Sequence, residues 1–348
     1  MKITRIGLDL AKQVFQVHGV DEKGRKVVSR QLKRAQVEEF FRGLEPCLVG
    51  MEACGGSNHW ARVLGAQGHE VKLMAPQHVK PYVKGNKNDA NDAEGICEAV
   101  GRPNMRFVAL KTVEQQGLQA LHRVRRTLMR NRTAAVNEIR GLLAEYGIVV
   151  SVGVGKLRAR LPELLEETDN GLPMSFRPVL SGLKEDLEYL DRRIGEMDAA
   201  MLRVVQEDDR ARELMRLRGV GPTTATALLA ALGDGRQFTR GRQASAWVGI
   251  VPGQHSSGGK ERLLGISKRG DAYLRTLLIH GARSVVNSCK GKTDPLSRWV
   301  QELCARRNKN VAAVALANKT MRIAWVLMSQ GGRYDPDYGV NKQAEQTA

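Results

Sequence analysis

The fold is decided by the first 32 residues of the chain, which read MKITRIGLDLAKQVFQVHGVDEKGRKVVSRQL. Three mainly apolar stretches, 3–10, 14–20 and 26–32, are separated by short polar turns at 11–13 and 21–24. Short apolar runs bounded by turn residues are typical of β-strands. We therefore expect three neighbouring strands joined by tight turns at the start of the chain.

Strands and helices alternate after this start. The spacing of apolar residues predicts a helix over 37–44, a strand over 47–51, a helix over 60–64 and a strand over 70–74. Strands joined by turns, followed by strands separated by helices, form a mixed sheet with helices packed on it. We predict an α/β domain over 1–110, with the strand order of a ribonuclease-H-like fold.

The middle of the chain, 111–212, is predicted to be helical and basic. No proline interrupts 113–146, where five arginines crowd together, among them Arg123, Arg125, Arg126 and Arg130. Farther on, apolar residues recur at alternating steps of three and four, the spacing of a coiled-coil seam. The seam consists of Leu180, Leu183, Leu187, Leu190, Ile194, Met197 and Met201. It predicts a helix paired between subunits or domains, or an amphipathic helix packed within its own domain.

The third segment, 213–333, is predicted to be a mainly helical domain. An apolar helix is expected over 227–232, and further helices over 273–328 with a break near Pro295. The last residues, 334–348, are polar and are expected to form a frayed tail.

The charge of the chain indicates a polyanionic partner. Lys and Arg number 55 against 37 Asp and Glu, which gives a formal net charge of +18. Clustered Lys and Arg neutralise phosphates and release counterions, so nucleic acid is the expected partner. An anionic membrane surface is the competing explanation. We identify no apolar run long enough to span a bilayer and no cleavable signal, and therefore expect no membrane association.

The five cysteines show no paired C-x-x-C spacing. Free thiols in a reducing cytoplasm fit this pattern better than a zinc site or a disulfide framework. With 42% hydrophobic residues the chain has enough apolar side chains for a sizeable core. The sequence therefore predicts a cytoplasmic nucleic-acid-binding protein.

Four carboxylates of the first segment stand in special places. Asp9 lies near the end of the first expected strand, Glu52 ends the fourth, and Asp89 and Asp92 are three residues apart on an expected helix. An acid in an apolar strand is costly to bury unless a cation or donor compensates it. Neighbouring acids also repel one another unless a divalent cation neutralises them. The four residues therefore predict a Mg²⁺ site, with two ions able to clamp a phosphodiester during displacement.

Each of these acids also has a purely structural interpretation. Asp9 could cap a turn, Glu52 could pair with a lysine, and the D-x-x-D pair could simply begin a solvated helix. Only the set as a whole, in a chain of +18 charge, favours the metal site.

A glycine-rich turn begins the third segment, in the stretch LRGVGPTTA from 217 to 225. Two glycines, Gly219 and Gly221, would let backbone amides approach a phosphate, and the helix beginning near Thr223 would add a favourable dipole. The pattern resembles the helix–hairpin–helix motif, which binds nucleic-acid backbone without reading sequence. A tight turn between helices with no ligand is the alternative.

A second glycine-rich segment, PGQHSSGGKER from 252 to 262, is expected to form a mobile loop. Basic residues surround it: Lys260, Arg262, Lys268 and Arg269. Such a loop could bind a backbone phosphate, and a serine held there could attack phosphorus if a base or metal takes its proton. His255 is a possible proton acceptor, and a merely solvated loop is the alternative.

Together these features resemble the DEDD-type insertion-sequence transposases related to the Piv invertase. The resemblance covers nearly the whole chain and is most specific in four pieces: Met51-Glu52-Ala53, the stretch NKNDANDA from 86 to 93, the G-V-G-P turn, and the SSGGK to ISKRG region from 256 to 270. Many members have threonine where this chain has Asn88, a position that is not a metal ligand.

The resemblance implies a RuvC-like N-terminal domain, a coiled-coil insertion and a mainly α C-terminal transposase domain. It implies that Asp9, Glu52, Asp89 and Asp92 form the metal-binding tetrad and that Ser256 is the nucleophile, with Ser257 as the alternative. It further implies a guide RNA that pairs with donor and target DNA, a homodimer that assembles into a tetramer with active sites shared between subunits, and a bacterial, nucleoid-associated location.

The function expected from these features is DNA recombination through a covalent phosphoserine intermediate, assisted by Mg²⁺. A hydrolytic RuvC-like junction endonuclease is one alternative, in which the tetrad activates water and the serine loop only binds phosphate. A nucleic-acid-binding protein without catalytic activity is the other.

Overall fold

The computed structural model describes residues 2–86 and 88–337 of the chain. It divides into two compact units, Met1–Thr112 and Val113–Ala348. The division falls two residues after the expected end of the N-terminal domain. The helical middle and the C-terminal domain, which we expected as separate parts, belong to the second unit. Of the expected polar tail, the part from 338 to 348 lies outside the described residues.

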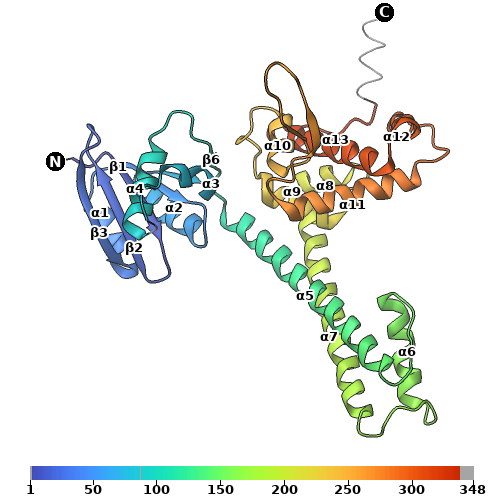
Figure 1. The fold of residues 1–348 in the computed structure, drawn as a ribbon. Coiled ribbons are helices and arrows are strands. Elements are labelled where there is room, and N and C mark those ends of the chain that lie inside the picture. Colours follow the sequence, from blue (N-terminus) through green and yellow to red (C-terminus); the bar gives the residue numbers. More distant parts are fainter. Residues whose placement is uncertain (1, 87, 338–348) are drawn as a thin grey trace, which may run out of the picture. The chain divides into compact units, whose positions relative to one another are not determined.

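A six-stranded mixed sheet with the order β3-β2-β1-β4-β5-β6 forms the centre of the N-terminal unit (Figure 1). β1 pairs antiparallel with β2 and parallel with β4, while β4 runs parallel to β5. The outer strands β3 and β6 are antiparallel to their neighbours. The strands are β1 Arg5–Leu10, β2 Val14–Val20, β3 Lys26–Lys33, β4 Leu48–Glu52, β5 Glu70–Met74 and β6 Phe107–Val108. The expected mixed α/β sheet is confirmed, and β6 is the strand that the sequence did not indicate.

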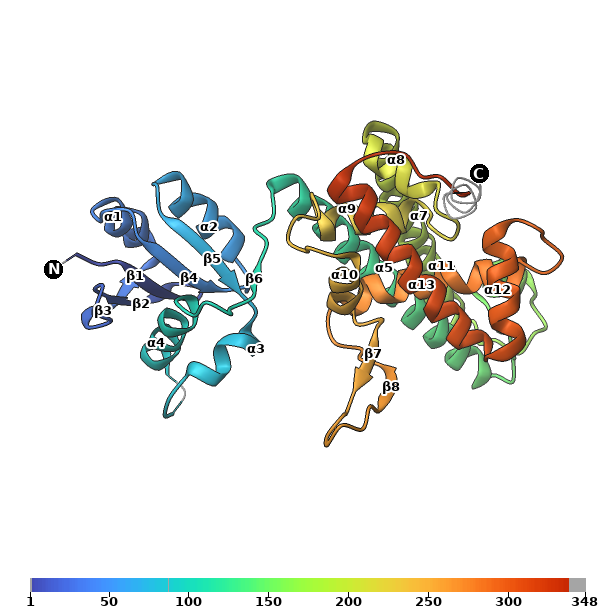
Figure 2. The same ribbon diagram turned by 90° about the horizontal axis from the view of Figure 1, so that it is seen from above.

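Helices cover both faces of this sheet, as Figure 2 shows, with α1 and α2 on one face and α4 on the other. The helices are α1 Val37–Arg42, α2 Ser57–Ala66, α3 Pro76–Val79 and α4 Asp89–Val100, with short 3-10 turns at Arg34–Gln36 and Lys80–Tyr82. Because successive side chains of a strand point to opposite faces, Ile6 and Leu8 of β1 pack with Phe41 and Trp60 on the α1–α2 side. The intervening residues of β1 therefore face α4.

The C-terminal unit contains a long pair of helices, α5 (Val113–Ala144) and α7 (Arg177–Glu207), with α6 (Val154–Glu166) beside their far end (Figure 1). α5 and α7 pack along one another within the same chain. Four of the seven expected seam residues on α7 are buried, at spacings of seven: Leu180, Leu187, Ile194 and Met201. The other three are only partly buried: Leu183, Leu190 and Met197.

The first three seam residues, Leu180, Leu183 and Leu187, pack within the C-terminal unit. Leu180 and Leu187 belong to a core cluster with Ile139 of α5 and Leu157 of α6. The seam is thus filled in part within its own chain, as the amphipathic alternative requires. A coiled coil between subunits stays a prediction.

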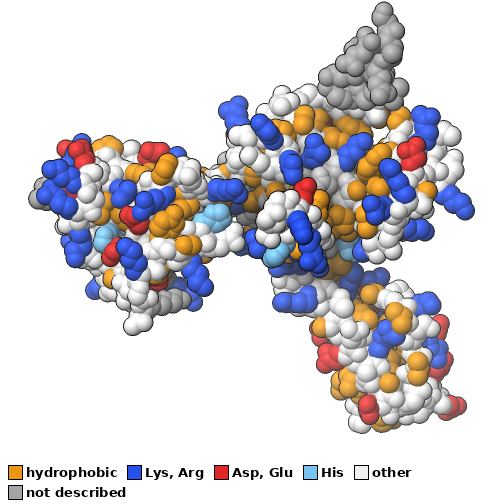
Figure 3. Space-filling view, turned by 45° about the horizontal axis from the view of Figure 1, so that its top comes forward, with side chains coloured by type: hydrophobic (Ala, Val, Ile, Leu, Met, Phe, Trp, Pro, Cys, Tyr) orange, Lys and Arg blue, Asp and Glu red, His pale blue; other side chains and the backbone are white. Residues whose placement is uncertain are grey.

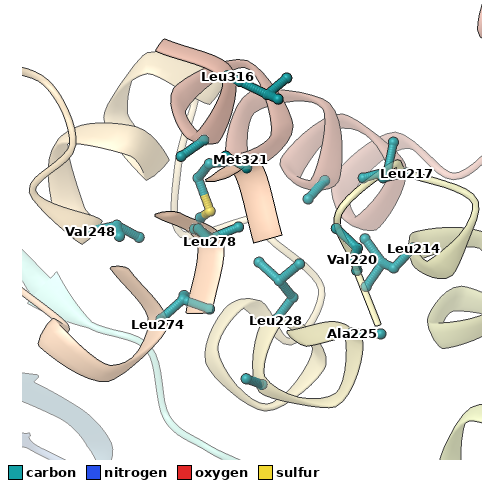
Figure 4. Packing of buried hydrophobic residues seen from close by; sticks show 14 of the residues in the cluster. Leu214, Leu217, Val220, Ala225, Leu228, Val248, Leu274, Leu278, Leu316 and Met321 are labelled. Atoms are coloured by element: carbon teal, nitrogen blue, oxygen red, sulfur yellow. The ribbon is translucent and has the colours of Figure 1, made fainter. Parts of the chain in front are cut away.

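The remaining helices of this unit enclose a second core (Figure 4). They are α8 Asp209–Met215, α9 Pro222–Leu232, α10 Gly241–Val248, α11 Ala272–Ser288, α12 Pro295–Arg306 and α13 Lys309–Gln330. Leu228 of α9, Leu278 of α11 and Met321 of α13 are each at most 2% exposed and lie close together in Figure 4. Full burial of such side chains contributes about 2 kcal/mol each. This core forms the support for the two glycine-rich segments.

The helix α13 corrects one expectation from the sequence. It has 22 residues and is long and apolar enough, by length and composition, to cross a membrane, so the statement that no such run exists was wrong. Half of its most apolar window is buried inside the unit. Leu316 and Met321 belong to the same core as α9 and α11. The apolar composition of α13 is therefore accounted for by packing within the protein.

Candidate active site and nucleic-acid interface

Asp9 and Glu52 lie at the carboxyl ends of two neighbouring parallel strands. β1 and β4 are in register with Leu8 beside Met51, so the next residue of each strand is Asp9 and Glu52. Both carboxylates are partly buried. The crevice beyond the carboxyl ends of parallel strands is where α/β proteins commonly bind ligands. The sheet therefore brings these two acids to one edge of the unit.

Two glycines let α4 lie directly on this part of the sheet. A Cβ added to Gly7 would overlap the carbonyl oxygen of Ala93, and one added to Gly50 would lie 2.7 Å from Cβ of Val100. Gly7 and Gly50 therefore face α4. Asp9 follows Gly7 by two residues on β1, and Glu52 follows Gly50 by two on β4, so both acids stand on the face that α4 covers.

The direction of α4 brings its acidic first turn toward the same edge. The end of the helix at Gly101 lies against the side chain of Arg5, near the start of β1, and Cys97 and Ala93 lie against Gly7. The helix thus runs opposite to β1, and its first residues lie toward the Asp9 end of that strand. Asp89 is exposed and Asp92 is partly buried there.

The first turn of α4 is also stabilised without any metal. The side chain of Asn88 caps the helix by accepting a hydrogen bond of 2.8 Å from the backbone N–H of Asn91. Asp89 and Asp92 complement the positive end of the helix dipole. Their presence at this position is therefore compatible with the structural interpretation as well as with the metal site.

Cys54 lies beside both Asp9 and Glu52. Desolvation raises the pKa of the Cys54 thiol, and the carboxylates of Glu52 and Asp9 raise it further. A thiol with a raised pKa is a poor nucleophile at neutral pH. Cys54 is therefore not a candidate catalytic thiol.

The four carboxylates fit a hard divalent cation by their chemistry, because Mg²⁺ prefers oxygen ligands. Within residues 2–86 and 88–337, however, no three His, Cys, Asp or Glu side chains are grouped closely enough to hold a metal ion. The fold places Asp9 and Glu52 side by side and directs the first turn of α4 toward their edge. The complete four-residue ligand set stays a prediction.

The serine segment forms an ordered β-hairpin, where a mobile loop was expected (Figure 2). Its strands are β7 Pro252–Gln254 and β8 Leu263–Ile266, and the bridge from Ser257 to Lys260 closes its tip. Gly258 and Gly259, between them, have φ angles of +56° and +76°. Two consecutive positive φ values are the mark of a type I′ turn, which matches the twist of an antiparallel hairpin. Glycine supplies this conformation at no steric cost.

Ser256 is held on the hairpin by two donors. Its Oγ accepts a hydrogen bond of 3.1 Å from the backbone N–H of Arg262 and one of 3.0 Å from the Gln254 side chain. Both partners donate, so the hydroxyl hydrogen of Ser256 remains available. Among the described residues, the hydrogen bonds to Ser256 Oγ come from Gln254 and Arg262 and not from the ring of His255. A base for Ser256 would have to come with the substrate or a metal.

Close backbone contacts fix the foot of the hairpin. A Cβ on Gly270 would overlap the carbonyl oxygen of Trp247, and one on Gly249 would overlap the backbone of Arg269. Lys268 has a φ of +54°, which a residue with a side chain adopts only at a cost. The basic residues of the hairpin and its foot are all exposed: Lys260, Arg262, Lys268 and Arg269.

The G-V-G-P turn lies between α8 and α9, and its two glycines have different surroundings. A Cβ on Gly219 would lie 2.7 Å from the carbonyl oxygen of Gly281 on α11, whereas nothing lies within 4 Å of the equivalent position at Gly221. Gly219 is therefore explained by close packing, and only Gly221 is open. A phosphate contact through Gly219, Gly221 and Thr223 stays a prediction.

The four predicted nucleic-acid arginines of α5 also differ from one another. Arg125 forms an ion pair with Asp198 of α7, with its Nε 2.5 Å from the carboxylate, and is only partly exposed. It therefore joins α5 to α7. Arg123, Arg126 and Arg130 are exposed. Figure 3 shows many Lys and Arg side chains over this unit, whereas acidic side chains gather around the far end of the α5–α7 pair.

The sequence did not indicate a buried polar chain between α5, α9 and α11. His122 of α5 is 5% exposed and lies within hydrogen-bond distance of Tyr273, at 3.0 Å, and of Thr226, at 3.1 Å. Burial lowers the pKa of His122 to about 4, so the ring is neutral at physiological pH. A lone histidine on a basic helix gives no sequence signal for partners 104 and 151 residues away.

Comparison with known proteins gives consistent matches. Residues 6–148 match a transposase family of the DEDD type, and residues 211–296 match a family described as "Transposase IS116/IS110/IS902 family". A probable family 20 transposase of Pseudomonas aeruginosa is 54% identical over 97% of this chain and its own full length. The transposase for insertion sequence element IS1111A of Coxiella burnetii is 47% identical over 94% of this chain and 90% of its own length. The transposase for insertion sequence element IS1328 of Yersinia enterocolitica is 41% identical over 94% and 98%.

Proposed function

The chain belongs to the IS116/IS110/IS902 family of transposases, and from this premise we propose that it cuts and rejoins DNA through a covalent link to Ser256. One observation carries the proposal. Asp9 and Glu52 end neighbouring parallel strands on the face that α4 covers, and the acidic first turn of α4 is directed toward them. This arrangement favours phosphodiester chemistry over mere binding of nucleic acid.

The carboxylates have the role of metal ligands in this proposal. Asp9 and Glu52 would hold the cation at the strand ends, and Asp89 and Asp92 would complete its ligands from α4. One or two bound Mg²⁺ ions would supply positive charge beside the scissile phosphate and assist deprotonation of the attacking hydroxyl. The short strands and the glycine contacts with α4 keep Asp9 and Glu52 in position without reorganisation.

Ser256 has the role of nucleophile. Its Oγ attacks the phosphorus, the new Oγ–P bond replaces one P–O bond of the DNA, and the released sugar oxygen takes up a proton. After strand exchange, a sugar hydroxyl of another strand attacks the same phosphorus, and Ser256 regains its proton. One phosphoester bond forms for each that breaks, so no nucleoside triphosphate is needed.

The proposal also includes RNA guidance and assembly of copies of the chain into dimers and tetramers within the nucleoid. The charge of +18 supports extensive contact with nucleic-acid backbone. Base pairing by a guide RNA would then choose the DNA sites, and the protein would bind phosphates and helix shape.

The test traps the covalent intermediate. Purified protein is incubated with Mg²⁺, RNA transcribed from the element and labelled DNA carrying the element's ends, and protein–DNA adducts are separated under denaturing conditions. We expect an adduct with the natural chain and with Ser257→Ala but none with Ser256→Ala. Asp9→Asn should abolish the adduct while RNA binding is retained, because arginines and not carboxylates hold the nucleic acid.

Other outcomes of the same experiment identify the alternatives. Nicked, unlinked strands with no adduct would indicate a hydrolytic junction endonuclease in which Ser256 only binds phosphate. An adduct that persists in Ser256→Ala would transfer the role to another residue. Absence of any Mg²⁺-dependent cleavage would leave a protein that binds nucleic acid without cutting it.

A further inference from the structure

A cleft of about 270 Å³ lies between α5, α9 and the start of α11, entirely within the C-terminal unit. Its wall on α5 carries Arg123 and Arg126, which are three residues apart and so lie on one side of the helix. Its floor consists of small residues of α9: Ala227, Ala230 and Ala231. The cleft therefore combines strong hydrogen-bond donors with an apolar floor that has no bulky side chain.

Tyr273 lines the same cleft and is held there by the buried polar chain. The hydroxyl of Thr226 lies 2.8 Å from the carbonyl oxygen of Pro222 and donates its hydrogen to it, as threonine in a helix commonly does. Its lone pair is then free to accept from Nε2 of His122. Nδ1 of His122 is therefore unprotonated and accepts the hydroxyl hydrogen of Tyr273.

This order of donors determines what Tyr273 offers to a ligand. Its hydrogen is used within the protein, so its oxygen presents only lone pairs to the cleft, and its ring is fixed in orientation. The guanidinium of Arg126 lies 5.8 Å from the centre of that ring. An aromatic face, an acceptor and two guanidinium groups together suit a nucleotide better than a simple anion, which an acceptor would repel.

The two arginines are available for such a ligand. Neither Arg123 nor Arg126 takes part in an ion pair among the described residues, whereas Arg125 between them is paired with Asp198. The cleft wall also contains one acidic residue, Asp271. Its Oδ1 accepts hydrogen bonds from the backbone N–H groups of Tyr273 and Leu274, at 2.9 and 3.0 Å.

The cleft adjoins the foot of the serine hairpin along the chain. Lys268 and Arg269 are followed directly by Gly270 and Asp271, where the wall of the cleft begins. The exposed cations at the hairpin foot therefore lie two to three residues from this wall along the chain.

We propose that this cleft holds one nucleotide of an unpaired nucleic-acid strand, with its phosphate between Arg123 and Arg126 and its base on the alanine floor beside Tyr273. The inference rests on the proposed function in that the strand is one the transposase processes. Binding in the cleft does not depend on the chemistry of Ser256, so all tests use the full chain carrying Ser256→Ala.

Binding of fluorescent oligothymidylate and of a matched duplex is measured by anisotropy over a range of salt concentrations. Arg123→Gln/Arg126→Gln should weaken binding of the single strand at least about tenfold and lower the salt slope by about 1. Arg306→Gln/Arg307→Gln at the end of α12 removes the same charge from residues that do not line the cleft, and should have a much smaller effect. Equal losses in both pairs would overturn the proposal, because they would indicate charge alone.

A second variant blocks the cleft without changing charge. Ala231→Leu should weaken binding of the single strand about fivefold, leave the salt slope unchanged and leave duplex binding unaffected, because only an unpaired base needs the floor. Unchanged binding of the single strand would overturn the proposal. Circular dichroism of the variant establishes that the helices are retained.

The third measurement locates the base directly. Oligonucleotides containing 4-thiothymidine are cross-linked by light to the Ser256→Ala protein, and the modified peptides are identified by mass spectrometry. We expect cross-links within 119–126, 227–231 or 271–274, and their loss in Ala231→Leu. Cross-links confined to other segments would overturn the inference, whereas the proposed serine chemistry would be unaffected by either result.

Discussion

The carboxylate edge of the N-terminal unit and the serine hairpin of the C-terminal unit are built in opposite ways. Asp9 and Glu52 end strands whose alternate residues are fully buried, and α4 touches the strand backbones at Gly7 and Gly50. Ser256 lies on a hairpin whose residues are almost all exposed. The carboxylates are thus positioned by the core of their unit, whereas the serine is positioned by a turn, two hydrogen bonds and the hairpin foot.

This difference has a consequence for substitutions. A change to the backbone contacts that position the carboxylates should destabilise the whole N-terminal unit, because positioning and stability share these contacts. A change that disturbs Ser256 should leave the stability of its unit intact. Four experiments test this contrast.

The largest effect is expected from Gly7→Val. The new side chain would overlap the backbone of α4, so we expect the N-terminal unit to lose about 3 kcal/mol of unfolding free energy. Hydrogen exchange measured by mass spectrometry would show faster exchange throughout 2–86 and 88–112. Gly65→Ala on α2 is the control, because nothing lies within 4 Å of its Cβ, and it should be neutral or slightly stabilising. Local exchange confined to β1 would contradict the coupling of site and core.

A smaller effect is expected when the pH is lowered, which should destabilise the C-terminal unit through His122. Burial lowers the pKa of His122 to about 4 in the folded protein, below its ordinary 6.5, so the unfolded chain binds the additional proton between these values. The free energy of unfolding of the C-terminal unit has its full value above pH 6.5 and decreases as the pH falls toward 4. Water near the ring reduces this effect, so we expect the free energy of unfolding to decrease by about 2 kcal/mol between pH 6.5 and 4.

The measurement for this prediction is urea unfolding of the C-terminal unit as a function of pH. His122→Gln, which does not titrate, should flatten the profile between pH 6.5 and 4. In the N-terminal unit, desolvation also lowers the pKa of His18, but nearby Glu94 opposes the shift. His18 should therefore reduce the unfolding free energy of its unit at low pH by less than His122 does. An unchanged profile in His122→Gln would contradict the assignment.

The third effect is local to the hairpin. Gly259→Val places a branched side chain at a φ of +76° and should cost about 1–2 kcal/mol in formation of the turn. Gly258→Asn is the matched control, since asparagine is favoured at the first position of a type I′ turn. We expect faster amide exchange at His255 and Lys260 in the valine variant alone, with an unchanged unfolding midpoint of the unit. A lowered midpoint would show that the hairpin is part of the core after all.

The smallest effect is expected at Lys268. Its φ of +54° is strained for a residue with a side chain, so Lys268→Gly should stabilise the hairpin foot by about 0.5 kcal/mol. Lys268→Ala removes the charge but keeps the strain and should give no gain. We expect slower amide hydrogen exchange at Lys260 and Arg262 in Lys268→Gly than in Lys268→Ala. Equal exchange in the two variants would contradict the expected stabilisation.

The sequence predicted the N-terminal unit better than the hairpin for a physical reason. The strands β1, β2, β4 and β5 are apolar runs because they are buried, and such runs are the sequence signal from which strands are predicted. β6 has two residues, too few for any pattern. The hairpin is exposed on both sides, so no alternation marks it, and its Gly-Gly pair was interpreted as mobility when it forms a defined turn.

Pairings between distant residues were outside the reach of sequence patterns. The seam on α7 was recognised, but its partial filling by α5 and α6 depends on how the chain turns back between them. The bidentate ion pair of Arg125 with Asp198, 73 residues along the chain, is a contact that no local pattern indicates. For the four predicted metal ligands, the common sheet edge of Asp9 and Glu52 followed from the expected strands. The position of Asp89 and Asp92 depends on the direction of α4, which only its contacts at Gly7 and Gly101 determine.

The close backbone contacts at Gly249 and Gly270 fix the hairpin at its foot, so the direction of the whole hairpin is set there. From Pro252 at the foot to Ser256 is four residues, a lever arm of about 13 Å. A rotation of about 5° at the foot would therefore move the hydroxyl by about 1 Å, a displacement that matters for the line of attack of the proposed nucleophile. A small tilt at the foot is thereby amplified at the tip, so the position of the Ser256 hydroxyl depends on a few close backbone contacts far from it.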